Sequence, residues 1–164
     1  FKMTPPRYQS FAENDFPVHD LENHKISVKV IAGSFESISS SVQTHSPINI
    51  YEINGPLGSQ LKITLPEVSN TLVFQLSGKS SIGTQAVDQG NLAILRRSGD
   101  SLNLELNEES KVLILNGEPL DERVAAYGPF VMNTQQELMD AFKDFQEGKM
   151  GQLVNDTSPI MVKM

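Results

Sequence analysis

The sequence feature that most constrains the fold is a series of short runs, from Lys25 to Leu115, in which hydrophobic and polar residues alternate. A period of two predicts strands with one face in a core and the other in water. No segment with a helical period interrupts the series, so alternating strand–helix–strand units are not expected. We predict an all-β sandwich or small barrel. The predicted strands are Ile26–Val30, Ile48–Ile53, Leu61–Leu65, Thr71–Leu76, Leu92–Leu95, Leu102–Leu106 and Val112–Leu115.

Two regions depart from this simple alternation. Thr71–Leu76 is a nearly continuous apolar run, which predicts a strand buried on both faces. The first 25 residues contain Pro5, Pro6 and Pro17, and proline interrupts hydrogen-bonded ladders, so we predict an irregular leader. The residues that we expect in the core include Leu72, Phe74, Ile94 and Leu113.

One helix is predicted near the end of the chain. Thr134 with Glu137 forms a capping-box pattern, and Asn133 with Gln136 forms an equally good one. Gly148 stands where a helix C-terminal cap belongs. The apolar residues that share one face of this helix are Leu138, Phe142 and Phe145, with Met139 and Ala141 beside them.

Composition narrows the class of protein. The 164 residues suffice for one domain with a substantial core. The net charge of −7 and the scattered basic residues argue against direct binding to nucleic acid or to an anionic membrane. No apolar stretch approaches the ~20 residues that cross a bilayer. The absence of cysteine excludes disulfides, thiolate metal sites and a cysteine nucleophile. We expect a cytoplasmic location, or a nuclear one in a eukaryote.

Several stretches resemble the pirin family, a group of proteins with two cupin domains. The most specific is Gly117–Leu120 (GEPL) followed by Gly128–Thr134 (GPFVMNT) and the predicted helix. Lys2–Gln9 resembles the linker between the family's two cupins, and Val30–Gly33 resembles its VIAG strand. The stretches occur in the family's order and cover most of the chain. Locally, the GPFVMNT stretch predicts a strand–turn–helix junction without chemistry of its own.

The resemblance implies a fold and a domain division. The implied fold is a double-stranded β-helix, the jelly-roll-like cupin barrel, with one C-terminal α-helix. Residues 1–24 would form the interdomain linker and leader, 25–132 the C-terminal cupin barrel, and 133–164 the terminal helix and tail. The chain would then be the second of two cupins. The family's transition metal, iron or similar, would belong to the N-terminal cupin that this chain lacks.

A cupin metal site needs three or four imidazole and carboxylate ligands that converge inside the barrel. The usual sequence form is His-x-His, then a glutamate, then a later histidine. The matching region lacks histidine, and Glu67 alone cannot hold a transition metal. We therefore predict no catalytic, cofactor-binding or metal-binding residue in this chain. The residues at or near the expected ligand positions are Leu65, Pro66, Glu67, Val68, Thr71 and Gln75.

The remaining residues with chemical potential have simpler interpretations. We interpret His19 and His24 as solvated leader residues, although a metal site that they form with Asp20 and Glu22 is an alternative. His45 precedes a strand and is interpreted as a loop residue. No catalytic motif surrounds the serines between Ser37 and Ser41, and we predict that they form a flexible turn. For the adjacent Glu108 and Glu109 we predict a solvated hairpin tip and not an acid–base pair. These residues are Ser37, Ser39, Ser40, Ser41, Glu108 and Glu109.

These observations lead to three hypotheses about function. The first is a metal-free domain that supports or covers the N-terminal cupin, with a homodimer expected through the exposed interdomain face when that cupin is absent. The second is one part of a quercetin 2,3-dioxygenase, active only with the N-terminal domain. The third is a protein-binding module of a transcription cofactor. The resemblance implies the last two roles for the full-length protein only, and this chain alone should be inactive.

Overall fold

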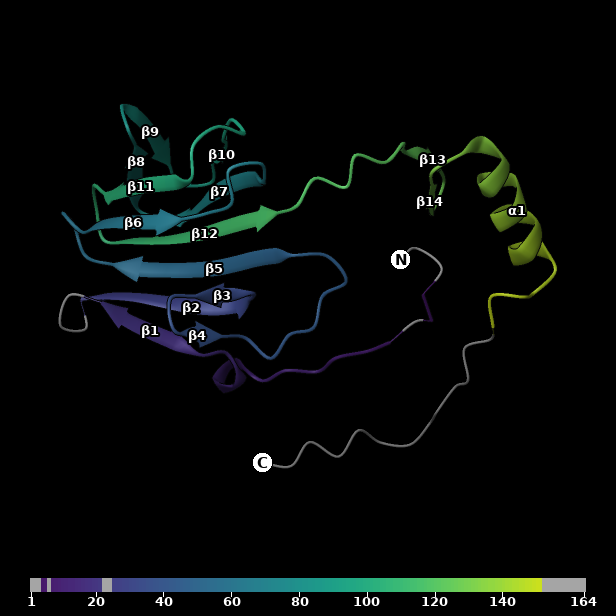
Figure 1. Ribbon diagram of the computed structural model, residues 1–164, viewed down its shortest axis with the longest axis horizontal. Helices are drawn as coiled ribbons and strands as arrows, with labels where there is room; N and C mark the ends of the chain where they lie inside the picture. The colour runs from purple at the N-terminus through teal and green to yellow at the C-terminus, as the bar shows by residue number, and fades with distance from the viewer. Residues whose placement is uncertain (1–3, 6, 22–24, 152–164) are drawn as a thin grey trace. The chain divides into compact units, whose positions relative to one another are not determined.

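A computed structural model describes residues 4–5, 7–21 and 25–151 of the chain. The chain divides into two compact units, Phe1–Pro119 and Leu120–Met164 (Figure 1). The sequence division had placed residues 120–132 with the barrel, whereas the compact-unit boundary assigns them to the same unit as the helix.

The larger unit contains two main antiparallel sheets (Figure 1). The six-stranded sheet has the order β1 (Val18–Leu21), β2 (Ile26–Ala32), β5 (Ile48–Gly55), β12 (Ser110–Gly117), β7 (Asn70–Ser77) and β10 (Leu92–Ile94). The four-stranded sheet has the order β6 (Gln60–Thr64), β11 (Ser101–Leu106), β8 (Lys79–Ile82) and β9 (Gln85–Asp88). The smaller elements are the 3-10 helix η1 (Glu13–Asp15) and the paired strands β3 (Ser34–Phe35) and β4 (Ile38–Ser39).

The two sheets pack against each other through one hydrophobic core. Val28, Ile53 and Ile114 of the six-stranded sheet share this core with Ile63 and Leu104 of the four-stranded sheet. Buried and more exposed residues alternate along β2, β11 and β12, which follows from the pleat of a strand. Each strand predicted from the period of two is present, and the predicted all-β architecture is confirmed.

The leader is more ordered than predicted. β1 pairs antiparallel with β2, with Val18 opposite Lys29 and Leu21 opposite Ile26. The carbonyl oxygen of Pro17 accepts a hydrogen bond from Val30 N, at 2.9 Å. The expectation of an irregular leader was therefore wrong for β1. Proline is tolerated beside an edge strand, so Pro17 did not exclude this strand.

Gly33 shows why the VIAG stretch ends in glycine. Its φ angle is +80°, which side-chain-bearing residues rarely adopt. A Cβ at this position would lie 2.2 Å from Asn49 Oδ1 and 2.4 Å from the Ile48 carbonyl oxygen. Only glycine lets β2 turn toward β3 this close to the start of β5.

The smaller unit contains a hairpin and a helix. β13 (Ala125–Tyr127) pairs with β14 (Phe130–Met132), and α1 (Gln135–Gln146) follows. The Phe130 ring packs edge-to-face on Phe142, with centroids 4.9 Å apart. Thr134 caps the helix, and Gly148, with φ +72°, follows the C-cap. The predicted helix and the strand–turn–helix junction are confirmed.

Candidate functional site

A metal or ligand inside the larger unit would meet the side chains that the two sheets turn toward each other. The hydrophobic side chains among them are almost entirely aliphatic, and of these only Tyr51 carries a polar atom, while the buried polar side chains of Thr71, Gln75, Ser80 and Asn116 also reach the interior. The hydrophobic ones are Val28, Val30, Tyr51, Ile53, Val73, Val112 and Ile114 from one sheet, and Ile63, Leu102, Leu104 and Leu106 from the other. An aliphatic lining supplies dispersion contacts but no electron pairs for a metal ion.

Tyr51 does not provide a ligand in its ordinary state. Its phenol donates a hydrogen bond to the carbonyl oxygen of Ser34. Burial raises the pKa of this phenol to about 12, so it stays protonated at neutral pH. A metal would require the phenolate and would break the hydrogen bond to Ser34.

Gln75 and Thr71, which lie near the expected ligand positions, do point into the interior. Gln75 is fully buried, and its amide oxygen accepts a 2.5 Å hydrogen bond from Ser80 Oγ. Its amide nitrogen donates to the carbonyl oxygen of Ser77, at 2.7 Å. Thr71 Oγ1 accepts from Asn116 Nδ2, at 3.0 Å. Among the described residues, every buried side-chain nitrogen or oxygen has a partner, so none awaits a ligand.

The carboxylate nearest the expected ligand positions lies outside the interior. Glu67 is exposed and occupies the turn between β6 and β7. Within the described part of the chain, no group of three or more His, Asp or Glu could hold a metal ion. The residues that the structure describes therefore do not fit a transition-metal site.

The structure changes the interpretation of one histidine. His19 Nε2 lies 2.9 Å from Glu36 Oε2, and its ring packs against Phe35 with centroids 5.7 Å apart. The expectation of a solvated His19 was wrong, because β1 places this side chain against the hairpin of β3 and β4. His45 is an exposed loop residue, as predicted. His24 lies outside the described residues, as does Glu22, so the alternative site that includes them has no structural description.

The serines and the paired glutamates have structural roles. Ser40 Oγ donates to the carbonyl oxygen of Ile31, at 2.7 Å, and accepts from Val42 N, at 3.2 Å. Ser39 belongs to β4 and Ser37 to the turn before it, so the expectation of one flexible turn was wrong. Glu108 and Glu109 are exposed in the turn between β11 and β12, as predicted, but these strands belong to different sheets, so the expectation of a hairpin tip was wrong.

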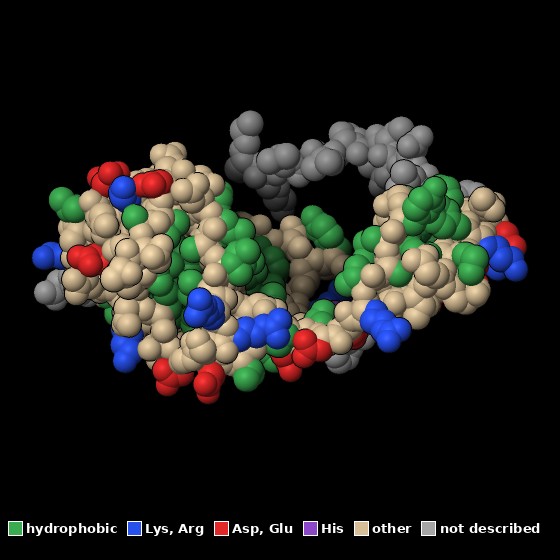
Figure 2. All heavy atoms as spheres, turned by 90° about the horizontal axis from the view of Figure 1, so that it is seen from above, with side chains coloured by type: hydrophobic (Ala, Val, Ile, Leu, Met, Phe, Trp, Pro, Cys, Tyr) green, Lys and Arg blue, Asp and Glu red, His purple; other side chains and the backbone are tan. Residues whose placement is uncertain are grey.

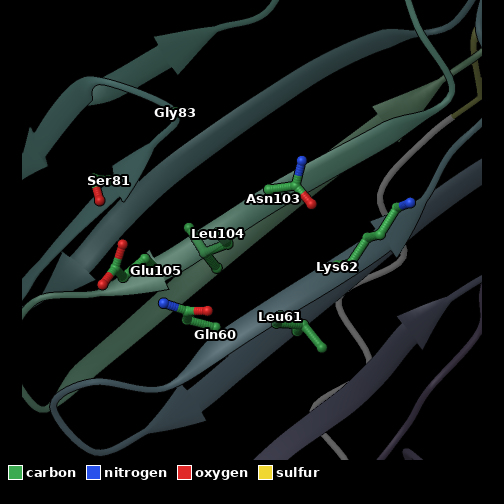
Figure 3. A pocket seen from close by; sticks show the side chains of 8 residues that line it. All are labelled: Gln60, Leu61, Lys62, Ser81, Gly83, Asn103, Leu104 and Glu105. Atoms are coloured by element: carbon green, nitrogen blue, oxygen red, sulfur yellow. The ribbon is translucent and has the colours of Figure 1, made fainter.

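The outer face of the four-stranded sheet is polar. A hollow of about 420 Å³ lies on it, and the labelled residues come mainly from β6 and β11 (Figure 3). Asn103 lies opposite Lys62, and Glu105 opposite Gln60. Exposed groups of both charges and amides favour water on this face, and one carboxylate does not make an acid–base pair. The lining residues are Gln60, Leu61, Lys62, Ser81, Gly83, Asn103, Leu104 and Glu105.

The outer face of the six-stranded sheet is apolar over β7, β10 and part of β5 and β12. Leu113 lies opposite Phe74, and Phe74 lies opposite Leu92, so aliphatic and aromatic side chains adjoin across three strands. Leu92 and Ile94 are 50% and 75% exposed. Hydrophobic side chains are visible at the surface of the larger unit in Figure 2. We name this set the outer apolar face: Ile50, Leu72, Phe74, Leu76, Leu92, Ile94, Leu113 and Leu115.

The outer apolar face corrects two expectations from the sequence. Leu72, Phe74, Ile94 and Leu113 were expected in the core, but they point away from it. β7 was expected to be buried on both faces, but only its inner positions are fully buried. An uncovered apolar patch of this kind is typical of a surface that contacts another molecule. No helix in the described part of the chain is both long and apolar enough to cross a membrane.

The two facing antiparallel sheets with this strand order define the class of the protein as a cupin-type barrel. The same fold occurs in the crystal structure of a protein named quercetin 2,3-dioxygenase from Acinetobacter baumannii. The TM-score is 0.87 at 37% identity, over 93% of this chain and 54% of that chain. Residues 50–151 match the family described as the Pirin C-terminal cupin domain. The chain therefore belongs to the pirin family, and both the resemblance and the implied cupin fold are confirmed.

Curated relatives support the same assignment. A Pseudomonas aeruginosa protein, provisionally named a quercetin 2,3-dioxygenase, is 36% identical over 148 residues, which are 90% of this chain and 52% of that protein. A pirin-like protein of Solanum lycopersicum is 32% identical over 155 residues, covering 92% of this chain and 52% of its own length. The chain thus spans about half the length of the curated relatives that it matches.

Proposed function

We propose that this chain is a metal-free, non-catalytic cupin domain that supports or covers a metal-bearing cupin of the same protein. The observation that carries the proposal is the mainly aliphatic interior, in which Ser80 and the Ser77 carbonyl satisfy the Gln75 amide near the positions where ligands are expected. A neutral amide–hydroxyl pair does not offer the imidazole and carboxylate set that a transition metal prefers. The relatives are about twice as long, which leaves room for a second cupin.

Metal content after loading tests this proposal. The purified chain is incubated in turn with iron, manganese, nickel and copper, desalted, and analysed by mass spectrometry of the elements. We expect well under one ion per chain for each metal. His19→Ala is the matched control for adventitious binding at the His19–Glu36 pair. One tightly held ion per chain in both proteins would overturn the proposal. Mutation would then begin with His24, His45 and Glu67.

The outer apolar face gives this domain a surface for the metal-bearing cupin. The outer face of the four-stranded sheet is polar, whereas the six-stranded sheet carries the outer apolar face. Covering the six-stranded sheet would therefore remove more apolar surface from water and stabilise the protein more. At the β2, β5 and β12 positions next to the face, Glu52 Oε1 lies 3.7 Å from both Lys29 Nζ and Lys111 Nζ. These paired charges would form a polar rim around an apolar contact, as in many protein interfaces.

A second candidate function is participation in quercetin 2,3-dioxygenase activity, which the name of the similar Acinetobacter protein favours. The absence of a fitting ligand set among the described residues supports placing the chemistry in another cupin of the full-length protein. This chain alone should then consume quercetin no faster than the added metal salt does. Turnover by the isolated chain above that blank would contradict the assignment, and it would do so even if metal content stayed low.

A further inference from the structure

A groove opens where the two sheets come to an end. β10 is the last strand of the six-stranded sheet, β9 is the last strand of the four-stranded sheet, and neither pairs with the other. A hollow of about 540 Å³ lies between them, within the size range of small-molecule sites. We name it the β9–β10 groove. Its lining residues are Ile82, Gln85, Ala86, Val87 and Asn91 to Arg96.

The floor of the β9–β10 groove is apolar. Ile82, Ala93 and Leu95 pack against the hydrophobic core and also line the groove. Val87 is buried and lies opposite Ser80, so it also points inward. These four side chains come from β8, β9, β10 and the residue that follows β10, and they would contact a flat ligand along its length.

The groove carries one cation and no anion. Arg96 follows the last apolar lining residue and forms no salt bridge with any residue that the structure describes. The nearest carboxylate on β9, Asp88, is paired with Lys79 at 2.8 Å and does not line the groove. The chain as a whole has a net charge of −7, whereas the residues that line the groove carry a net positive charge. A guanidinium with no side-chain partner among the described residues fits a carboxylate, which it can bind with two hydrogen bonds.

We propose that the β9–β10 groove binds a small, flat, apolar carboxylate. The apolar body lies on Ile82, Val87, Ala93 and Leu95, and the carboxylate meets Arg96. The exposed amides of Gln85 and Asn91 supply further donors at the margin of the groove. The site needs neither a metal nor a second cupin, so it stands or falls independently of the function proposed above.

A pair of matched probes tests the groove. 2-Naphthoate and the uncharged naphthalene-2-carboxamide are titrated into the 164-residue chain and followed by two-dimensional amide NMR. We expect shifts at Val87, Ala93 and Leu95, and about tenfold tighter binding of the carboxylate, because a charge-assisted bond is stronger than a neutral one. Arg96→Gln should lower carboxylate affinity to that of the carboxamide and leave carboxamide affinity unchanged.

The neighbouring arginine provides the control. Arg97 Nε donates to Asn70 Oδ1, at 2.7 Å, and Arg97 does not line the groove. Arg97→Gln should therefore leave both affinities unchanged. Ala93→Phe should fill the groove and abolish binding of both probes, with an amide spectrum that still reports a folded chain.

Four results would overturn the proposal. The first is equal affinity for the two probes. The second is equal loss in Arg96→Gln and Arg97→Gln, which would indicate a general charge effect. The third is no binding up to the solubility limit. The fourth is a set of shifts confined to Leu72, Phe74 and Leu113. Shifts of that kind would mean that the probe adsorbs to the outer apolar face instead.

Discussion

Gln75 and Ser80 connect the two sheets by a single buried hydrogen bond. Gln75 belongs to β7 in the six-stranded sheet, and Ser80 belongs to β8 in the four-stranded sheet. Both side chains have no exposed surface, so Gln75 Oε1 and Ser80 Oγ depend on each other, while Gln75 Nε2 donates to the Ser77 carbonyl oxygen. A buried polar pair of this kind lowers the stability of the fold little while its hydrogen bond is made. Removal of one partner destabilises the fold strongly, because the other partner is left buried without a hydrogen bond.

This dependence predicts non-additive mutations. Ser80→Ala leaves Gln75 Oε1 without its donor and should lower the free energy of unfolding by about 1–3 kcal/mol, measured by urea denaturation. Adding Gln75→Met should recover part of that loss, because the orphaned amide is then gone. Ser81→Ala, at a more exposed neighbour, is the control and should change stability by about 0.5 kcal/mol or less. Additive losses in the double variant would contradict the coupling.

Tyr51 predicts a loss of stability in alkali. Burial raises its pKa from about 10 to about 12, so the folded chain holds the phenol proton more tightly than the unfolded chain does. This contribution to stability is complete below pH ~10 and is lost as pH rises toward ~12. Tyr51→Phe should cost about 1 kcal/mol at neutral pH through the lost hydrogen bond to Ser34.

Denaturation at a series of pH values checks the sign. The stability difference between the wild type and Tyr51→Phe should shrink as the pH rises through this window. A difference that stays constant from neutral pH to pH ~12 would show that the two states bind the phenol proton equally.

At the scale of elements, the hydrophobic pattern predicted where these strands lie, but it predicted burial of both faces of β7, and only one face is fully buried. Thr71 and Gln75 are polar yet buried, whereas Leu72 and Phe74 are apolar and lie on the outer face. Alternation gives two faces, and the apolar one is normally assigned to the core. The assignment fails here because the inner polar residues have partners on other strands that no local pattern reveals.

Several strands could not be predicted from the sequence for a related reason. β8 carries Ser80 and Ser81 at its centre, and β1 is four residues long with His19 and Asp20 in the middle. In such segments, alternate residues differ little in hydrophobicity, so the period of two is hardly detectable in the sequence. Pairing with longer neighbours holds them in the sheets, and that pairing depends on tertiary structure.

The capping box of α1 gives a prediction for the smaller unit. Thr134 Oγ1 accepts a hydrogen bond from Glu137 N, and Glu137 Oε2 accepts one from Thr134 N. The sequence offered Asn133 with Gln136 as an equal alternative, and the structure selects Thr134. Thr134→Ala should destabilise the helix by about 1 kcal/mol, whereas Thr134→Ser should change little.

Hydrogen exchange of the α1 amides measures the effect of these caps. Protection should fall in the first turn of Thr134→Ala and stay near wild type in Thr134→Ser. Equal protection in all three proteins would mean that packing of Phe142 on Phe130, and not the cap, sets the stability of this helix.

At the scale of the whole molecule, the family and fold were predictable because specific stretches such as GPFVMNT carry them. The sites were less predictable. The contact of His19 with Glu36 joins residues 17 positions apart through a strand that the sequence did not reveal. The β9–β10 groove depends on where two sheets end, which is a property of topology. An apolar interdomain surface was expected, but four residues of the outer apolar face, Leu72, Phe74, Ile94 and Leu113, were assigned to the core.

The outer apolar face predicts self-association of the isolated chain. We expect light scattering to give twice the chain mass at high concentration, from a symmetric pair in which both copies use this face. Leu113→Lys introduces the same charge on both sides of such a contact. It should raise the dissociation constant by about 100-fold or more, since each buried leucine contributes roughly 1.5–3 kcal/mol.

A substitution on the other sheet controls for added charge. Asn103→Lys places the same side chain on the polar outer face of the four-stranded sheet and should leave the dimer intact. A wild-type chain that remains a strict monomer would disprove the association. Equal weakening by both substitutions would attribute it to net charge.

The restriction of the apolar surface to one sheet has a kinetic consequence. The larger unit would then bind one partner at a time through the outer apolar face. A second copy of the chain and a metal-bearing cupin would compete for that face. A dimer of this chain would have to dissociate before a cupin partner could bind. At saturating partner, exchange would then run at the rate of dimer dissociation, independent of how much partner is added.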